Sequence, residues 1–157
     1  MPDTVCIDRN FWDDWKLKDL DFLTKSVFVY LVLHKDRTSL GCLQKSLEDM
    51  CKGTGLSLGQ ITQSTEQCIS HKLLLQGKDN WWFMPTYLEW QKPEYYVSWQ
   101  SIKAALEAMP KDVDFVEELL SVICAQVQDI PPQELSILNG LQSLLKGDTF
   151  FDNIKHQ

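Results

Sequence analysis

The sequence predicts a mainly helical α+β chain with one small β-hairpin. Three observations support this fold class. Apolar side chains recur at the three- to four-residue spacing of amphipathic helices. Serine, aspartate or proline stands where most of these helices would begin. Two short apolar runs flank the polar letters GKDN, as in a hairpin. The composition, 44% hydrophobic and 24% charged over 157 residues, is that of an ordinary globular protein.

The first predicted helix begins at Phe22, after a capping Asp21, and runs to about His34. The run Val27–Leu33 inside it is apolar without alternation, so on its own it could equally be a buried strand. The capping aspartate favours the helix. A short strand is expected next, at Gly41–Gln44.

Two helices joined by a glycine-containing turn follow. Ser46 can cap the first, Gly53 and Gly55 can end it, and Ser57 can cap a second helix over Leu58–His71. At helical spacing, the second helix should turn these residues inward: Leu58, Ile61, Thr65, Cys68 and Ile69. Its outward face should hold Gln60, Gln63, Ser64 and Gln67.

The letters LLLQGKDNWWFMP predict a hairpin with its turn in GKDN. Neighbouring residues of a strand point to opposite faces, so Trp81 and Trp82 should lie on opposite faces of the hairpin. We expect Trp82 and Met84 to pack on the helices, and Trp81 and Phe83 to lie on an outer face. Cover of that outer face by the C-terminal helices or by a second copy is favoured over stacking on nucleic acid.

The balance of charged residues changes near Pro93. Residues 1–92 carry 11 Lys and Arg against 12 Asp and Glu, whereas residues 93–157 carry 4 against 10. We therefore divide the chain into a near-neutral domain, 1–92, and an acidic helical extension, 93–157. Helices are expected in the extension over residues 97–109, 113–127 and 132–147, before a loosely ordered tail. The third should carry one apolar stripe: Leu135, Leu138, Leu141 and Leu145.

No catalytic or metal-binding constellation is found in the sequence. Cys68 and His71 have the spacing C-x-x-H, but no second pair completes a metal site, and the glycine-containing segments lack a phosphate-loop lysine. We therefore expect no enzyme, no cofactor and no small-molecule substrate. No signal peptide or membrane span is predicted, and five scattered cysteines suit reduced thiols in a cytoplasmic protein.

The predicted order of helix, strand, helix, turn, helix and hairpin is that of a winged helix-turn-helix followed by C-terminal helices. Beyond this order, the segments FWDDWKLKDL, VFVYLVLH, GCLQKSLEDMCKGTGLS, TEQCISHKLLLQG and WWFMPTYLEWQ resemble the N-terminal domain of DnaD-like replication initiation proteins, the phage replisome organisers. The likeness covers roughly residues 10–110. It implies a phage or prophage protein that docks to DNA and to replication proteins in helicase loading. The C-terminal third does not clearly match the separate DNA-binding domain of larger members.

Contact with DNA is expected from the second helix of the pair and from the hairpin turn. Glutamine can pair with adenine edges, serine with several groups, and lysine with phosphates. The candidate DNA-binding residues are Lys45, Lys52, Ser57, Gln60, Gln63, Ser64, Gln67, Lys72, Lys78 and Asn80. Glutamine and serine are equally common on any solvated helix face, and a formal charge of −7 opposes indiscriminate binding to phosphates.

Aromatic residues supply the candidate contacts with replication proteins or with a second copy in a homo-oligomer. They are Trp81, Phe83, Trp90, Tyr95, Tyr96 and Trp99. For the last four, the plainer interpretation is that they fix the C-terminal helices to the first domain. Two other functions stay open: a protein–protein assembly module that never touches DNA, and a winged-helix transcriptional regulator dimerised through its C-terminal helices.

Overall fold

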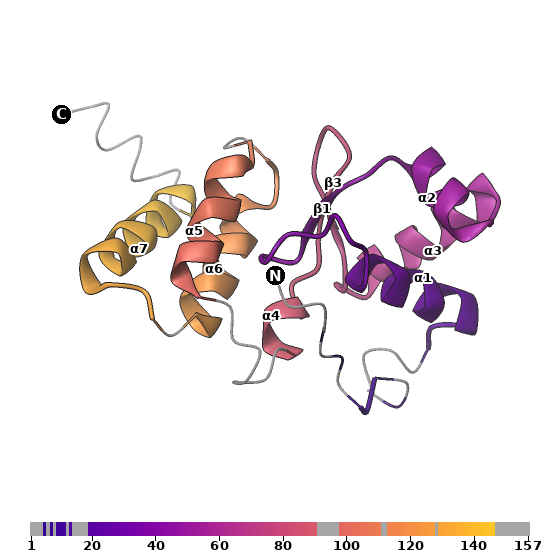
Figure 1. Cartoon of the computed structure of the whole chain (residues 1–157), viewed down its shortest axis with the longest axis horizontal. Coiled ribbons are helices and arrows are strands. Elements are labelled where there is room, and N and C mark those ends of the chain that lie inside the picture. Colours follow the sequence, from indigo (N-terminus) through magenta and orange to yellow (C-terminus); the bar gives the residue numbers. More distant parts are fainter. Residues whose placement is uncertain are drawn as a thin grey trace.

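The computed structural model describes residues 5, 7, 9–11, 13, 19–90, 98–110, 113–127 and 129–146. Within them the chain is mainly helical, with a small three-stranded antiparallel sheet, so the α+β class is confirmed. The elements are α1 (Phe22–Val32), β1 (Cys42–Gln44), α2 (Leu47–Thr54), α3 (Leu58–Ser70), β2 (Leu75–Gln76), β3 (Trp81–Phe83), α4 (Tyr87–Trp90), α5 (Trp99–Ala108), α6 (Val116–Gln126) and α7 (Pro132–Lys146). Figure 1 shows the sheet in the middle of the molecule, between α1–α3 on one side and α5–α7 on the other.

The first helix forms where its cap predicts. The Asp21 carboxylate accepts a hydrogen bond from the backbone N–H of Thr24 at 2.7 Å, and hydrogen bonding to Thr24 lowers the pKa of that carboxyl. The apolar run that could equally have been a strand is helical, so the helix prediction is confirmed. It buries Thr24, Val27, Phe28, Leu31 and Val32. These residues recur at three- and four-residue spacing, so α1 buries one face against the core.

The α2–turn–α3 unit is defined by its caps. Ser46 accepts the N–H of Asp49 at 3.1 Å and starts α2, and Gly55 ends it in the left-handed conformation with φ of 77°. Ser57 and Gln60 then form a reciprocal capping box: the Ser57 hydroxyl accepts the Gln60 N–H, and the Gln60 side chain accepts the Ser57 N–H. These local signals position the start of α3.

α3 packs against α1 with a buried stripe that only partly matches the expectation. Ile61, Thr65 and Cys68 are buried as expected. The outward placement of Ser64 is wrong: this residue is 1% exposed, because it lies three positions after Ile61 and four before Cys68 and so shares their stripe. The inward placement of Leu58 is also wrong: it is 52% exposed, because the whole first turn of α3 extends beyond the core.

The sheet has β3 at its centre. Its strand order is β1-β3-β2 and both pairings are antiparallel, so the predicted hairpin forms and the predicted strand before α2 joins it. In the turn between β2 and β3, Asp79 and Asn80 have φ of 57° and 65°. Asp and Asn tolerate this left-handed region, and two such residues in succession suit the turns that match the twist of a hairpin.

The tryptophan doublet lies on β3, with both indoles buried. Trp82 and Met84 are 2% and 0% exposed, as expected of residues that pack inward. Trp81 and Phe83, which were placed on the outer face, are buried as well, with 9% and 0% exposed. The reason is the C-terminal helical part: the ring of Phe115 lies 5.5 Å from that of Phe83. Cover by the C-terminal helices, the favoured alternative, is therefore found for Phe83.

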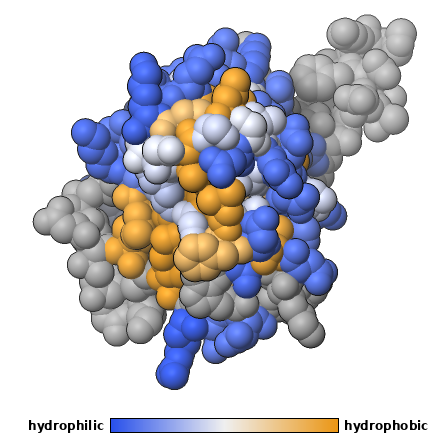
Figure 2. All heavy atoms as spheres, turned by 90° about the vertical axis from the view of Figure 1, so that its right-hand side faces the viewer, coloured by the Kyte–Doolittle hydropathy of each residue, from blue (hydrophilic) through white to orange (hydrophobic). Residues whose placement is uncertain are grey.

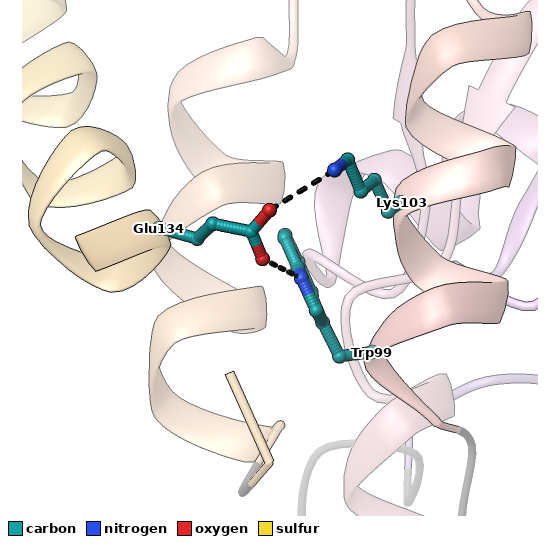
Figure 3. A network of polar contacts seen from close by, with 3 residues as sticks. All are labelled: Trp99, Lys103 and Glu134. Atoms are coloured by element: carbon teal, nitrogen blue, oxygen red, sulfur yellow. Dashed lines mark hydrogen bonds and ion pairs between the residues drawn. The ribbon is translucent and has the colours of Figure 1, made fainter. Parts of the chain in front are cut away.

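The three C-terminal helices form within the predicted ranges. The chain entering α5 is bound to the segment before α7, because the Asp129 carboxylate accepts the backbone N–H of Trp99 at 3.0 Å. Figure 3 shows a second tie, in which Glu134 accepts hydrogen bonds from the Trp99 indole and, at 3.0 Å, from the Lys103 ammonium. Hydrogen bonding between Lys103 and Glu134 raises the pKa of the lysine and lowers the pKa of the glutamate.

The predicted apolar stripe of α7 is only partly buried. Leu138 is 7% exposed and Leu135 is half-buried, whereas Leu141 is 46% exposed, so the buried part of the stripe ends at Leu138. The side chain of Leu145 lies outside the described residues. So do Pro93, the domain boundary predicted beside it and the predicted tail.

Candidate nucleic-acid interface

The outward face of α3 carries glutamines, as the sequence predicts. Gln60, Gln63 and Gln67 are exposed. The side chains of Ser57 and Gln60 are engaged in the capping box at the start of the helix. Among the described residues of this face, Gln63 and Gln67 are therefore the glutamines whose amides are not committed to the cap. Ser64 is buried behind them and offers no hydroxyl to a ligand.

The β2–β3 turn is bound to the chain that enters α2. The Lys45 N–H donates to the carbonyl of Asn80 at 2.8 Å, and the Gln44 side-chain amide donates to the carbonyl of Asp79 at 3.1 Å. On the other side, the indole of Trp82 donates to the carbonyl of Lys45 at 2.8 Å. These bonds hold the turn in one position beside the start of α2.

These bonds bring together four polar residues from two distant segments. Lys78 and Asn80 from the turn and Gln44 from β1 are exposed, and Lys45 is half-buried beside them. We call these four residues the turn cluster. Three of them were candidates from the sequence. Gln44 was missed, although its position as the polar end of the short strand CLQ is a signal that could have found it.

The other two candidate lysines lie apart from each other. Lys52 is exposed in the last turn of α2, near the start of α3, whereas Lys72 follows the other end of α3. A helix of the length of α3 separates them by about 20 Å. Lys72 also lines a hollow together with Glu117 and Glu118 of α6. The structure therefore does not gather the lysines into one basic patch.

Acidic side chains share the same elements. Glu48 and Asp49 occupy the first turn of α2, Glu66 lies on α3, and Asp79 lies at the β2–β3 turn; all four are exposed. Carboxylates repel phosphate groups, so they limit the number of phosphates that this side of the chain can contact. Any binding to nucleic acid through these elements must therefore depend on a few well-placed groups.

The candidate aromatic contacts are mostly inside the protein. Trp81, Phe83 and Trp99 are buried, which removes them as ready-made surface contacts. Trp90 is half-buried, with its ring 5.7 Å from that of Phe11 and 5.8 Å from that of Phe28. Tyr95 and Tyr96 lie outside the described residues.

The Cys68–His71 spacing brings no metal ligands together. Burial raises the pKa of the Cys68 thiol to about 12, and the thiol lies in the core. The imidazole Nδ1 of His71 lies 3.0 Å from the carbonyl of Gln67 in its own helix. Across the described residues, no group of three His, Cys, Asp or Glu side chains could hold a metal ion.

An apolar surface that sequence reasoning missed lies on the α1–α3 side. Figure 2 shows a stripe of apolar atoms flanked by hydrophilic ones on this face. Phe22 and Leu33 at the two ends of α1 are 78% and 54% exposed, and Leu58 at the start of α3 is 52% exposed. Large exposed apolar side chains of this kind are typical of interaction surfaces. The described helices include none with the length and apolar character needed to cross a membrane.

Comparisons of the chain with protein-family models, with curated proteins and with solved structures find no match.

Proposed function

We propose that this chain is a non-enzymatic winged-helix protein that docks on duplex DNA and takes part in initiating DNA replication, as a phage or prophage replisome organiser does. The order α1, β1, α2, α3, β2, β3 and the sheet order β1-β3-β2 support the winged-helix assignment. In it, α3 is the recognition helix and the β2–β3 turn is the wing. The replication role rests on the resemblance of residues 10–110 to replisome organisers.

The observation that carries the proposal is the bonding of the wing to the chain before α2. Because the backbone of Lys45 is held between Asn80 and Trp82, the two lysines and two side-chain amides of the turn cluster extend from one fixed stretch of backbone. Preformed polar groups of this kind suit phosphate and sugar contacts, while the Gln63 and Gln67 amides suit base edges in a major groove. The small number of lysines implies weak binding with a shallow dependence on salt.

Fluorescence anisotropy with a labelled duplex, at low and moderate salt, tests the DNA contact. The double variant Lys45→Ala/Lys78→Ala should weaken binding about tenfold and lower the salt slope by about two. The control, Lys25→Ala/Lys103→Ala, removes the same charge from α1 and α5 and should leave affinity nearly unchanged. Equal effects of the two variants would mean that general charge, not the wing, governs binding.

A separate variant tests the recognition helix. Gln63→Ala/Gln67→Ala should reduce discrimination between duplex sequences while leaving most of the non-specific affinity, because glutamine amides contact bases rather than phosphates. Sequence preference is measured by competition among randomised duplexes. An unchanged preference in this variant would exclude α3 as the base-reading element.

A protein–protein assembly module is the second candidate. The exposed apolar side chains of Phe22, Leu33 and Leu58 favour it, as does the net charge of −7. Light scattering measures the assembly state, and titration with duplex and single-stranded DNA at low salt measures binding. A stable oligomer that binds neither form of DNA would favour this function over DNA docking.

A further inference from the structure

A groove runs between the edge strand β2 and helix α6. Among the described strands, β2 has a neighbour on only one side, because β3 is the central strand of the sheet. Two hollows, of about 250 and 560 Å³, lie beside it. Both are lined by Leu75 of β2 and Glu118 of α6, so they adjoin. Together they form what we call the β2–α6 groove, which is separate from the turn cluster and from the glutamines of α3.

The backbone of β2 directs polar groups into this groove. Leu75 is paired with Phe83, and the N–H of Gly77 donates to the carbonyl of Trp81 at 2.7 Å. In an antiparallel ladder, alternate residues turn their N–H and C=O toward the neighbouring strand. Gln76, between Leu75 and Gly77, therefore turns its N–H and C=O away from β3. Gln76 also lines the smaller hollow, so these groups are at the open edge of the sheet.

The walls of the groove combine an apolar floor with a negative rim. The apolar lining comprises Ile69, Leu75, Pro85, Phe115 and Val122. The charged lining is Asp114, Glu117 and Glu118 against Lys72 alone, a formal charge of −2. No hydrogen bond or ion pair joins the three carboxylates to another described side chain. Their charge is therefore available to an incoming cation.

We propose that the β2–α6 groove binds an extended segment of a partner protein that carries lysine or arginine, and that this segment adds to the sheet beside β2. Addition of a strand to an open edge gains main-chain hydrogen bonds, here with the N–H and C=O of Gln76. Apolar side chains of the segment pack on Leu75 and Phe115. Its cations lie against Glu117 and Glu118. The charge of the rim selects a basic peptide and repels the phosphates of nucleic acid.

Labelled peptides measure this binding on the full chain. The probe is an alternating Lys-Val hexapeptide with a fluorophore, and the reference peptide alternates Glu and Val. The Lys-Val peptide should bind and the Glu-Val peptide should not. The variant Glu117→Gln/Glu118→Gln should weaken binding about fivefold to tenfold, since each exposed ion pair contributes modestly. Failure of the Lys-Val peptide to bind would overturn the proposal.

A matched variant separates the groove from general charge. Glu48→Gln/Glu66→Gln removes two exposed carboxylates from α2 and α3, which do not line the groove. Peptide affinity should be the same in this variant as in the unaltered chain. An equal loss in both double variants would show that the peptide responds only to net charge, and would overturn the site.

Hydrogen exchange tests strand addition itself. Binding should slow exchange at the amide of Gln76, whereas the amide of Gln44 on β1 at the other edge of the sheet should be unchanged. Binding without slower exchange at Gln76 would overturn the addition of a strand. The mass of the protein in solution tests the identity of the occupant. A dimer that becomes a monomer in Glu117→Gln/Glu118→Gln would show that the groove binds a second copy of the chain and not a partner protein.

Discussion

The indole Nε1 of Trp82 donates a hydrogen bond to the backbone carbonyl of Lys45, 2.8 Å away. The neighbouring indole, that of Trp81, is buried, and its Nε1 has no hydrogen-bond partner among the described residues. The two residues therefore share a strand and a buried environment but differ in one polar contact. Trp82 joins β3 to the entry of α2, while Trp81 packs on the opposite face of the sheet.

The doublet allows a matched stability test. Trp82→Phe removes the hydrogen bond to Lys45, and Trp81→Phe removes an N–H that has no partner; the loss of side-chain volume is the same in both. Because a hydrogen bond contributes about 1 kcal/mol net and an unpaired buried donor is costly, Trp82→Phe should lower the free energy of unfolding by about 1–2 kcal/mol more than Trp81→Phe. Urea unfolding followed by circular dichroism measures both. A larger loss from Trp81→Phe would contradict this assignment of the two indoles.

Gly77 should be sensitive to substitution because the C-terminal part lies against it. A Cβ at this position would come within 2.7 Å of the Val113 side chain and 2.9 Å of the Phe115 ring. Gly77→Ala should therefore lower the free energy of unfolding by about 1–3 kcal/mol through overpacking. Gly140 in α7 is the control, since a Cβ there meets nothing within 4 Å. Gly140→Ala should raise stability by up to about 1 kcal/mol, and chemical denaturation measures both changes. Tolerance of Gly77→Ala would mean that the contact between the two parts is loose.

Lys72 has a backbone conformation that glycine adopts more easily. Its φ is 60°, and it follows the C-cap of α3, where the next N–H, that of Leu73, donates to the carbonyl of Cys68 at 2.9 Å. This is the left-handed position that usually carries glycine after a helix. Lys72→Gly should therefore raise the free energy of unfolding by up to about 1 kcal/mol.

Lys52 supplies the comparison, because it is an exposed lysine within α2. Lys52→Gly should lower the free energy of unfolding by up to about 1 kcal/mol, since glycine is unfavourable inside a helix. Thermal and urea denaturation of the two variants should therefore shift in opposite directions. Shifts of the same sign would show that the charge of the lysine, not its backbone conformation, decides the effect.

Local signals in the sequence predict most of the elements, and tertiary contacts account for what they miss. Asp21, Ser46 and Ser57 each start a helix by accepting a hydrogen bond from the backbone N–H three residues later. These boundaries therefore follow from a few neighbouring residues. The inward or outward direction of Phe83 depends instead on Phe115, which lies 32 positions away. Strand alternation separates the two faces of a hairpin, but it cannot tell which elements will cover each face.

The turn cluster shows the same limit for the candidate site. Lysines and glutamines can be selected from the sequence by type, but their grouping depends on the pairing of β1 with β3 and on the hydrogen bond from Trp82 to Lys45. Lys72 was a candidate because it is a lysine next to the predicted recognition helix, yet it lines the same hollow as Glu117 and Glu118. Those two carboxylates are more than 40 positions away, and nothing in the sequence around Lys72 indicates them.

His34 should make the stability of the chain depend on pH. Its side chain is 7% exposed, its Nδ1 accepts the N–H of Asp36 at 3.0 Å, and its ring meets that of Tyr30 edge to face. Burial, followed by the charge of Lys45, lowers the pKa of this imidazole below its ordinary value of 6.5; the charge of Asp36 opposes the shift in part. The folded chain therefore favours neutral His34.

The sign of the effect follows from proton binding. Below about pH 6.5 the unfolded chain binds a proton at His34 more readily than the folded chain does, so stability falls as the pH is lowered through this range toward the folded-state pKa. Thermal unfolding between pH 7.5 and about pH 5.5 should show this fall, and His34→Gln should reduce it. His71→Gln, at a histidine whose Nδ1 lies 3.0 Å from the carbonyl of Gln67 in its own helix, is measured as the matched histidine variant. If His34→Gln retains the full pH dependence, protonation occurs elsewhere in the chain.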